Sequence, residues 1–222
     1  MVLRILKELY HSNFKSLYFN FKYLPFKKAI KLPFRVSNKF SLTILKGSVS
    51  IVSELSPGMI LLGYGHVGIF NKKRQRSMWS VSGKVIFKGN CYLGHGTKIN
   101  VTETGVLTFG NGVNFTAESS VDCQKEIIFG DHCLVSWESL FIDGDYHKLF
   151  DAEGRLTNSP RSIIIGNHVW FGCRCLILKG VSVADNCVIA AGSVLNGKYE
   201  IPKAIIAGSP AKIVKENISW EI

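Results

Sequence analysis

The chain has 222 residues and a formal net charge of +11 at pH 7, and 46% of its residues are apolar. That apolar share supports a buried core and excludes wholesale disorder, while the length fits one domain with an appendage or two small domains. No apolar stretch approaches the roughly 20 residues that span a bilayer, and the first residues lack the apolar core and cleavage site of a signal peptide. We therefore expect a cytoplasmic protein.

Positive charge is concentrated in residues 1–50, which hold ten Lys or Arg against the single acid Glu8. Phe, Tyr and Leu are interleaved with these cations, and Pro25 and Pro33 interrupt them, which predicts one or two short amphipathic helices. Such a segment caps the open end of the repeat described below, or contacts an anionic membrane surface at the inner face of the membrane, and the two roles are compatible. No recognised nucleic-acid motif accompanies the charge, so we expect no nucleic-acid partner.

A GxGxxG sequence occupies residues 63–68, after the apolar run MILL. A dinucleotide site would require a following helix and an acid about 20 residues later. The residues that follow are IFNKKRQRSMWS, and no Asp or Glu occurs between Glu54 and Glu103. We assign these glycines to an irregular first coil of the repeat.

An apolar residue recurs every six positions in the rest of the chain, and a compact residue follows four positions after most of its members. The longest run is Ile165, Phe171, Ile177, Val183 and Ile189. Three shorter runs precede it: Phe87, Leu93 and Ile99; Phe109, Phe115 and Val121; Phe129, Val135 and Phe141. This period predicts a β-helix in which three hexads close one triangular coil, and the coils stack because none can bury its apolar face alone.

Extra residues interrupt this ladder only after the third hexad of a coil, so all insertions should emerge at one corner of the prism. The longest insertion, residues 142–164, begins Asp143-Gly144-Asp145-Tyr146-His147. Histidine titrates near neutrality, and a loop that leaves the prism can reach a neighbouring subunit. His147 is therefore a candidate general base.

Four of the six cysteines occupy the compact positions of the hexads: Cys91, Cys133, Cys175 and Cys187. We predict that these are small buried packing residues rather than disulfides or metal ligands. The chain has no CxxC sequence, and no trio of histidines has the spacing of a zinc site, so we expect no metal.

The segment IGNHVWFGCRCLILKGVSVADNCVIAAGSVLNGKYEIPKAIIAGSPAKIVK, residues 165–215, resembles the C-terminal signature of hexapeptide-repeat acyltransferases. Together with LVSWESLFIDGDYH at 134–147 it most resembles bacterial polysaccharide O-acetyltransferases, including those that modify capsules. The resemblance covers roughly residues 83–218. It implies an all-β fold, a left-handed parallel β-helix over residues 51–218, although the spacing alone does not give the handedness.

The resemblance further implies acetyl transfer from acetyl-CoA to a sugar hydroxyl of a surface polysaccharide precursor, by direct attack with His147 as the base. Asp143 or Asp145 would orient the imidazole, or would only shape the turn. Coenzyme A would contact Trp170 and the backbone of Cys173 and Ala191, the Cys173 amide facing the thioester oxygen. The basic residues expected near its phosphates are Lys198, Lys212 and Lys215.

Two other functions stay open: acetylation of a small acceptor such as an amino sugar, serine or antibiotic, and a non-catalytic scaffold. A degenerate scaffold would have lost the loop histidine or the tail signature, and this chain has both. We expect a homotrimer, because flat prism sides pack around a threefold axis and the loop histidine must meet a coenzyme groove further along the prism.

Overall fold

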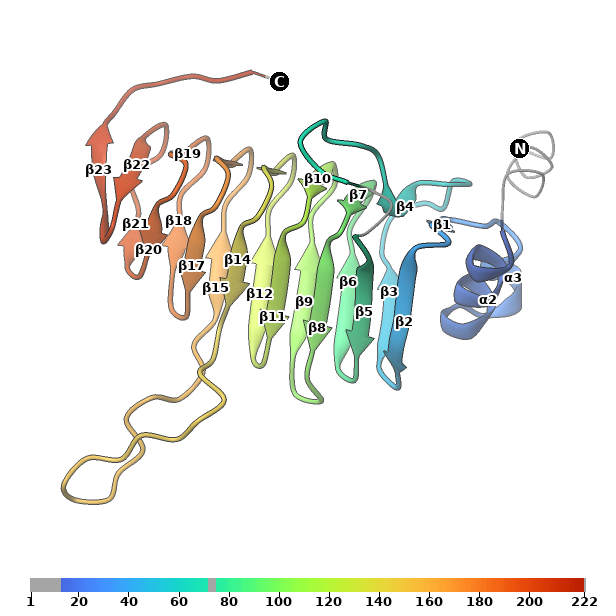
Figure 1. Cartoon of the computed structure of the whole chain (residues 1–222), viewed down its shortest axis with the longest axis horizontal. Coiled ribbons are helices and arrows are strands. Elements are labelled where there is room, and N and C mark those ends of the chain that lie inside the picture. Colours follow the sequence, from blue (N-terminus) through green and yellow to red (C-terminus); the bar gives the residue numbers. More distant parts are fainter. Residues whose placement is uncertain (1–12, 72–74, 222) are drawn as a thin grey trace.

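The computed structural model describes residues 13–71 and 75–221. Two helices, α2 (Phe14–Tyr23) and α3 (Phe26–Ala29), precede a column of short strands (Figure 1). Both helices end where the sequence predicts: Leu24 is the C-cap of α2, Pro25 is the N-cap of α3, and Pro33 follows α3. The two predicted short helices are therefore confirmed.

The strands form three sheets, and all neighbours are parallel except the last pair of the first sheet. The first sheet consists of β1 (Phe34–Val36), β4 (Ile60–Tyr64), β7 (Cys91–His95), β10 (Val113–Ala117), β13 (Leu134–Val135), β16 (Trp170–Phe171), β19 (Val188–Ile189), β22 (Ile205–Gly208) and β23 (Ala211–Lys215). The second consists of β2 (Phe40–Leu45), β5 (Ser77–Val81), β8 (Lys98–Val101), β11 (Ser120–Cys123), β14 (Leu140–Ile142), β17 (Leu176–Leu178) and β20 (Val194–Leu195). The third consists of β3 (Ser48–Ile51), β6 (Lys84–Phe87), β9 (Val106–Phe109), β12 (Glu126–Phe129), β15 (Ile163–Ile165), β18 (Ser182–Val183) and β21 (Lys198–Tyr199).

The chain visits the three sheets in turn, so each set of three strands closes one coil and the next coil stacks on it. The predicted fold class, an all-β left-handed parallel β-helix, is confirmed. The ladder positions also stack as predicted: Phe87 pairs with Phe109, which pairs with Phe129, and Phe129 pairs with Ile165. The rings of Phe109 and Phe129 lie 5.6 Å apart and nearly parallel, inside the prism. Large aromatic rings in register thus supply much of the buried apolar area.

The insertions follow the predicted corner from β7 onward. Residues 102–105, 124–125 and 143–162 all connect the second sheet to the third, and the last of these extends away from the prism (Figure 1). Most of the GxGxxG sequence instead lies in residues 65–68, after β4 of the first sheet and before β5 of the second. These glycines are in an irregular part of the second coil rather than the first coil that we expected, because β1, β2 and β3 already form a coil before them.

The boundary predicted at residue 50 between an N-terminal segment and the β-helix is wrong. Strands β1, β2 and β3 lie in residues 34–51 and form the first coil. The basic composition hid them because Lys39 and Lys46 lie in the turns on either side of β2, whereas Phe34 and Phe40 point into the core. The helical segment therefore ends before Phe34.

Helix α2 covers the free edge of β1, the outermost strand of the first sheet. The Asn20 amide donates to the Phe34 carbonyl at 2.8 Å and its oxygen accepts from the Phe34 N–H at 3.1 Å. The Ser16 hydroxyl accepts from the Val36 N–H at 2.8 Å. Both side chains are fully buried, and Phe19 beside them packs its ring against Phe34. Polar side chains of α2 thus make the hydrogen bonds that a neighbouring strand would otherwise make with this sheet edge.

The other end of the prism is closed by the antiparallel pair β22 and β23. Beyond it the chain runs back along the coils (Figure 1). Trp220 in this tail stacks on His168 with ring centres 4.0 Å apart and donates from Nε1 to the His168 carbonyl at 3.1 Å. Among the described residues, neither helix is long and apolar enough to span a membrane.

We expect Asn20→Ala to lower the free energy of unfolding by about 2–4 kcal/mol, because it leaves two buried backbone groups of Phe34 without partners. Urea denaturation measures the change. The matched control is Asn196→Ala, an exposed asparagine at the far end, for which we expect a change within about 0.5 kcal/mol. Equal effects of the two variants would show that Asn20 does not cap the edge.

Candidate active site

Asp143, the first polar residue of the loop, is fully buried at its base. Its carboxylate accepts the backbone N–H groups of Gln124 at 2.6 Å, Lys125 at 2.9 Å and Glu126 at 2.7 Å. Both oxygens are therefore occupied by the connection of the preceding coil. Asp143 therefore does not orient the His147 imidazole, which was one of the two roles expected for it. Its carboxylate shapes the turn where the loop leaves the prism.

Asp145 lies at the exposed base of the loop. Its carboxylate forms an ion pair with Lys179 and accepts from the Asn158 amide at 2.8 Å. The hydrogen bond from Lys179, followed by that from Asn158, lowers the pKa of Asp145 below its usual value. The same Asn158 amide donates to the His147 carbonyl at 2.7 Å. Asp145 is thus linked to the backbone of His147 rather than to its ring.

His147 itself is exposed and lines a cavity of about 180 Å³ between the loop and Gln124 of the preceding coil. Among the described residues, no side chain forms a hydrogen bond with its imidazole, so neither carboxylate orients the ring within one chain. The loop therefore holds the backbone of the histidine in place and leaves both ring nitrogens available to a substrate or to another subunit.

Tyr146 was missed as a site residue, although it directly precedes the histidine. Its hydroxyl donates to Asp122 at 2.5 Å and accepts from the Asn100 amide at 2.9 Å, and its φ is +62°. Burial, and then the hydrogen bond to Asp122, raises the pKa of Tyr146 to about 12. Asn100 and Asp122 are register partners on β8 and β11. Asn100 and Asp122 occupy equivalent positions in their hexads. That equivalence is the sequence signal that could have identified the pair as the anchor of the Tyr146 hydroxyl.

The residues expected to contact the coenzyme backbone meet at the corner between the first and second sheets. Cys173 follows β16 and Ala191 follows β19 in the next coil, and the Gly192 N–H donates to the Cys173 carbonyl at 2.9 Å. Among the described residues, the amide N–H groups of Cys173 and Ala191 have no partner. A Cβ atom on Gly172 would lie 2.6 Å from the Ala191 nitrogen, so only glycine permits the coils to approach here. The corner presents two unpaired donors about 4.8 Å apart along the prism.

Trp170 borders this corner with 37% of its surface exposed, and its Nε1 donates to Ser136 at 3.3 Å. The ring of Trp220 from the C-terminal tail lies 5.9 Å from it. Sequence reasoning missed Trp220, because nothing local shows that the tail returns to this coil. The two indoles thus lie close together at the coil that leads into Cys173.

The three candidate phosphate-binding lysines are separated. Lys212 and Lys215 are exposed on β23, at the end of the first sheet. Lys198 begins β21 of the third sheet, directly after the corner from which the loop leaves. The structure therefore does not bring Lys198 together with the others within one chain.

The loop and the amide corner lie at opposite edges of the second sheet. One side of the prism separates them, about six residues at about 3.3 Å each, or about 20 Å. The outward residues of that side in the C-terminal coils are partly exposed and apolar: Leu140, Ile142, Leu176, Leu178 and Val194. One chain by itself does not unite His147 with the amide corner.

The cysteines have no disulfide partners. Cys91, Cys123, Cys133, Cys175 and Cys187 are buried, which confirms the packing role predicted for four of them. Burial raises the pKa of the Cys133 thiol to about 12, whereas Cys173 is partly exposed at the amide corner. Within residues 13–71 and 75–221, no three His, Cys, Asp or Glu side chains are grouped as metal ligands.

Comparison with known proteins connects this geometry to named enzymes. A polysialic acid O-acetyltransferase of Neisseria meningitidis is 40% identical over 114 residues, which cover 51% of each protein. A galactoside O-acetyltransferase of Escherichia coli strain K12 is 30% identical over 129 residues, which cover 56% of this chain and 57% of that protein. The chain thus spans a little over half the length of these curated relatives.

Two solved structures are also similar. The polysialic acid O-acetyltransferase OatWY is 25% identical with a TM-score of 0.46, covering 85% of this chain and 87% of that one. A galactoside acetyltransferase in complex with coenzyme A is 21% identical with a TM-score of 0.49, covering 60% and 64%. Residues 162–197 match the bacterial transferase hexapeptide family, described as six repeats. The family match and the two curated relatives confirm the predicted resemblance of the chain to hexapeptide-repeat acetyltransferases.

Proposed function

We propose that the chain is an acetyl-CoA-dependent O-acetyltransferase that acts on a sugar hydroxyl of a surface polysaccharide precursor. The observation that carries the proposal is the pair of unpaired amide donors at Cys173 and Ala191, on the coil where Gly172 permits close approach. Fixed backbone donors of this kind stabilise charge that develops on a carbonyl oxygen. The named relatives, which act on polysialic acid and galactosides, support a sugar as the acceptor.

In the proposed reaction acetyl-CoA supplies the acetyl thioester, and each residue has one task. The His147 imidazole accepts the proton as the acceptor hydroxyl attacks, and later returns it to the departing thiolate. The Cys173 N–H donates to the carbonyl oxygen as negative charge develops there. The Ala191 N–H holds the pantetheine arm, and Trp170 with Trp220 lines its cleft. Lys212 and Lys215 neutralise phosphate groups beyond the end of the first sheet.

We further propose a homotrimer whose sites lie between chains. The loop and the amide corner lie at opposite edges of one apolar prism side, so packing around a threefold axis would bring the loop of one chain to the corner of the next. The loop itself carries exposed apolar residues far from any core of its own, namely Leu149, Phe150 and Leu156. Contiguous exposed apolar surface of this kind marks an interface. In such an assembly Lys198 would serve a coenzyme bound by a neighbour.

Contact with an anionic membrane surface stays a prediction. The outward face of the helical cap exposes Phe14 by 83% and Phe26 by 71%, together with Tyr18 and Phe21. Exposed lysines accompany them: Lys22, Lys27 and Lys28. Aromatic residues interleaved with lysines suit the interface of an anionic bilayer, and this pattern supports the proposal that the enzyme works at the inner face of the membrane. Co-sedimentation with anionic and with neutral vesicles measures this contact. Equal binding to both kinds of vesicle would contradict the predicted contact with an anionic surface.

Thiol labelling tests the coenzyme corner without any acceptor. At neutral pH we expect iodoacetamide to modify Cys173 and spare the other five cysteines, because buried thiols with raised pKa values stay protonated and shielded. Coenzyme A at ten times its dissociation constant should slow labelling of Cys173 about tenfold. Cys173→Ser is the control for the labelled site. A labelling rate that saturating coenzyme A leaves unchanged would place the coenzyme elsewhere.

We expect His147→Ala to retain its fold and coenzyme binding but to lose acetyl transfer by about 10²–10⁴-fold, the usual contribution of a positioned base. Its side chain is exposed and unbonded, so no stability loss should accompany the change. Steady-state rates with acetyl-CoA and a panel of glycans provide the measurement. Lys148→Ala, the adjacent exposed loop residue, is the control and should stay near wild type. A His147→Ala rate close to wild type would exclude the histidine as base.

Mixed trimers test whether the site is shared. A His147→Ala chain and a Trp170→Ala chain should each be impaired alone and should regain activity together, since some interfaces then pair an intact loop with an intact corner. Mass measurements verify that mixed trimers have formed. Full activity in a single chain would refute the trimer, and no recovery in verified mixed trimers would place base and groove in one subunit.

A further inference from the structure

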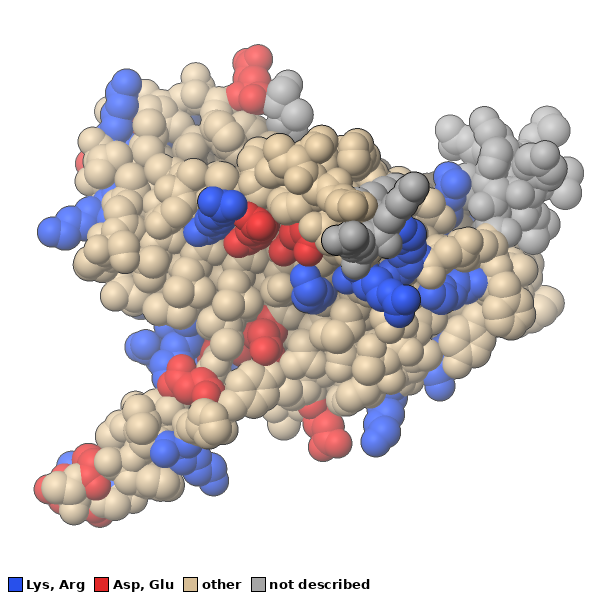
Figure 2. All heavy atoms as spheres, viewed as in Figure 1, with Lys and Arg blue, Asp and Glu red and all other residues tan. Residues whose placement is uncertain are grey.

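The loop that carries His147 extends as an arm beyond the prism, with acidic and basic side chains along it (Figure 2). Its leucine and phenylalanine side chains are all exposed, so no buried core holds the arm in place. The position of the proposed base therefore depends on hydrogen bonds at the neck of the loop. We define the neck as residues 145–149 on the outgoing arm and residues 156–158 on the return arm.

Asn158 connects the two arms of the neck. Its side-chain amide donates to the His147 carbonyl at 2.7 Å and to the Asp145 carboxylate at 2.8 Å. Its side-chain oxygen accepts the backbone N–H of Leu149, also at 2.7 Å. An asparagine amide has two N–H donors and one oxygen, and all of them are used here. Asn158 therefore bonds to the backbone of the histidine itself and to a residue on each side of it.

The prism holds Asn158 in turn. Lys179 directly follows β17, in the coil after the one from which the loop leaves. Its ammonium donates to the Asn158 carbonyl at 3.0 Å and forms the ion pair with Asp145. Only 17% of the Lys179 side chain is exposed, so the protein covers most of this cation. Both arms of the neck are thus bonded to one partly buried ammonium of the prism.

Tyr146 holds the outgoing arm from the other side. Its hydroxyl bonds to Asp122 of β11 and Asn100 of β8, in the two preceding coils. Its φ of +62° is uncommon for a residue with a bulky side chain, and such a backbone persists only where surrounding contacts impose it. Because His147 follows directly, this backbone sets the direction in which the histidine side chain leaves the neck.

We propose that Asn158 is a positioning residue for the proposed base, with Tyr146 as the second anchor. The two side chains fix the backbone on either side of His147 and leave its ring available to the acceptor. This inference rests on the proposed function, because the positioning matters only if His147 accepts the proton. A misplacement of about 1 Å in a reacting group can cost about 10²-fold in rate, and the arm offers no packing to prevent it.

Steady-state kinetics of Asn158→Ala test this role. We expect kcat for acetyl transfer to fall about 10–100-fold, whereas KM for acetyl-CoA should change less than about twofold, since the coenzyme corner lies at the other edge of the second sheet. Asn158→Asp keeps the shape and the acceptor for Leu149, but it loses both donors and faces the Asp145 carboxylate. It should therefore lose at least as much kcat as the alanine variant. An Asn158→Ala variant with kcat near wild type would overturn the proposal.

Non-additivity separates positioning from a merely structural effect. In a His147→Ala background, Asn158→Ala should change the remaining rate less than about twofold, because a residue that acts through the histidine then has nothing to position. Tyr146→Phe, which removes only the hydroxyl, should behave in the same way. If Asn158→Ala costs as much without the histidine as with it, Asn158 acts independently of the base and the proposal is overturned.

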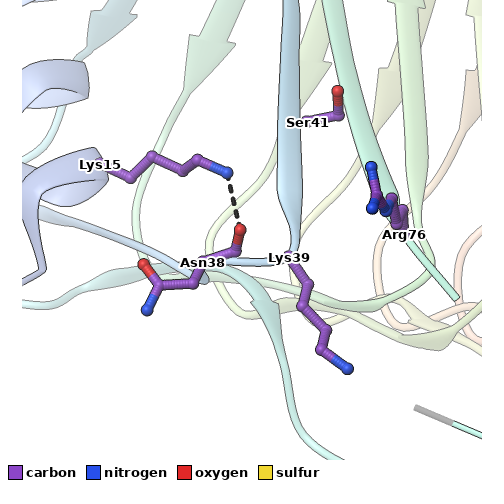
Figure 3. Close-up of a pocket in the computed structure, with 5 residues that line it drawn as sticks. All are labelled: Lys15, Asn38, Lys39, Ser41 and Arg76. Atoms are coloured by element: carbon purple, nitrogen blue, oxygen red, sulfur yellow. Dashed lines mark hydrogen bonds between the residues drawn. The ribbon is translucent and has the colours of Figure 1, made fainter. Parts of the chain in front are cut away.

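Two control variants match the change. Arg155→Ala removes the ion pairs with Asp151 and Glu153 at the tip of the same loop, and should keep kcat within about twofold. Asn38→Ala repeats the asparagine substitution at the N-terminal end of the prism, where only the backbone carbonyl of Asn38 accepts from Lys15 and alanine retains it (Figure 3). The pocket there is lined by Lys15, Asn38, Lys39, Ser41 and Arg76. A fall in kcat in either control as large as in Asn158→Ala would overturn the proposal.

Amide hydrogen exchange adds a readout that needs no turnover. Since the Leu149 N–H is bonded to Asn158, it should exchange at least about tenfold faster in Asn158→Ala and at the wild-type rate in Arg155→Ala. Unchanged exchange, together with an inactive His147→Ala variant, would overturn the positioning role and leave the proposed base intact. Faster exchange, together with an active His147→Ala variant, would refute the base and with it the positioning role.

Discussion

Each coil of this protein buries its apolar residues only by stacking on another, and that constraint governs the rest of the structure. Like positions must fall in register, as Phe109 does on Phe129, because a shifted ring would leave a void in a close-packed interior. Extra residues can then leave only at corners. The fold tolerates the loop with His147 because the loop leaves at a corner, where the chain turns between two sheets in any case. Asp143 also accepts the backbone N–H groups of residues 124–126 at this corner. The position of the candidate base is thus a consequence of how the core is built.

A stack of coils has two ends, and each needs its own solution. At the N-terminal end helix α2 packs its inner face against the edge of β1. Ser16 and Asn20 make the hydrogen bonds that a neighbouring strand would otherwise make. That leaves its outer face aromatic and its first turn beside a group of cations. At the other end β23 turns back on β22, and the tail carries Trp220 to His168 and near Trp170. Both caps therefore close the stack and also fix the positions of exposed aromatic side chains.

Two corners of the prism carry different chemistry. One holds His147, the proposed base, on a loop, and the other holds rigid backbone donors that have no partner among the described residues. Rigid donors suit a developing oxyanion, because they need no reorganisation when charge appears. The apolar side between the corners and the apolar loop residues Leu149 and Phe150 are surfaces that one chain leaves exposed. An assembly that buries them would also unite the two corners, so stability and catalysis would favour the same arrangement.

The sequence by itself determined the coils, the corner of the insertions and the residue types of the site, because hexad spacing and a loop histidine are local features. It could not show that residues 34–51 form a coil, since their lysines mask a short alternating pattern. Nor could it assign Asp143, whose partners at residues 124–126 become neighbours only when one coil stacks on another. The Tyr146 anchor, the return of Trp220 and the charge gathered around Lys15 were likewise decided by tertiary structure. Each depends on contacts between residues distant in sequence, and spacing along the chain does not encode such contacts.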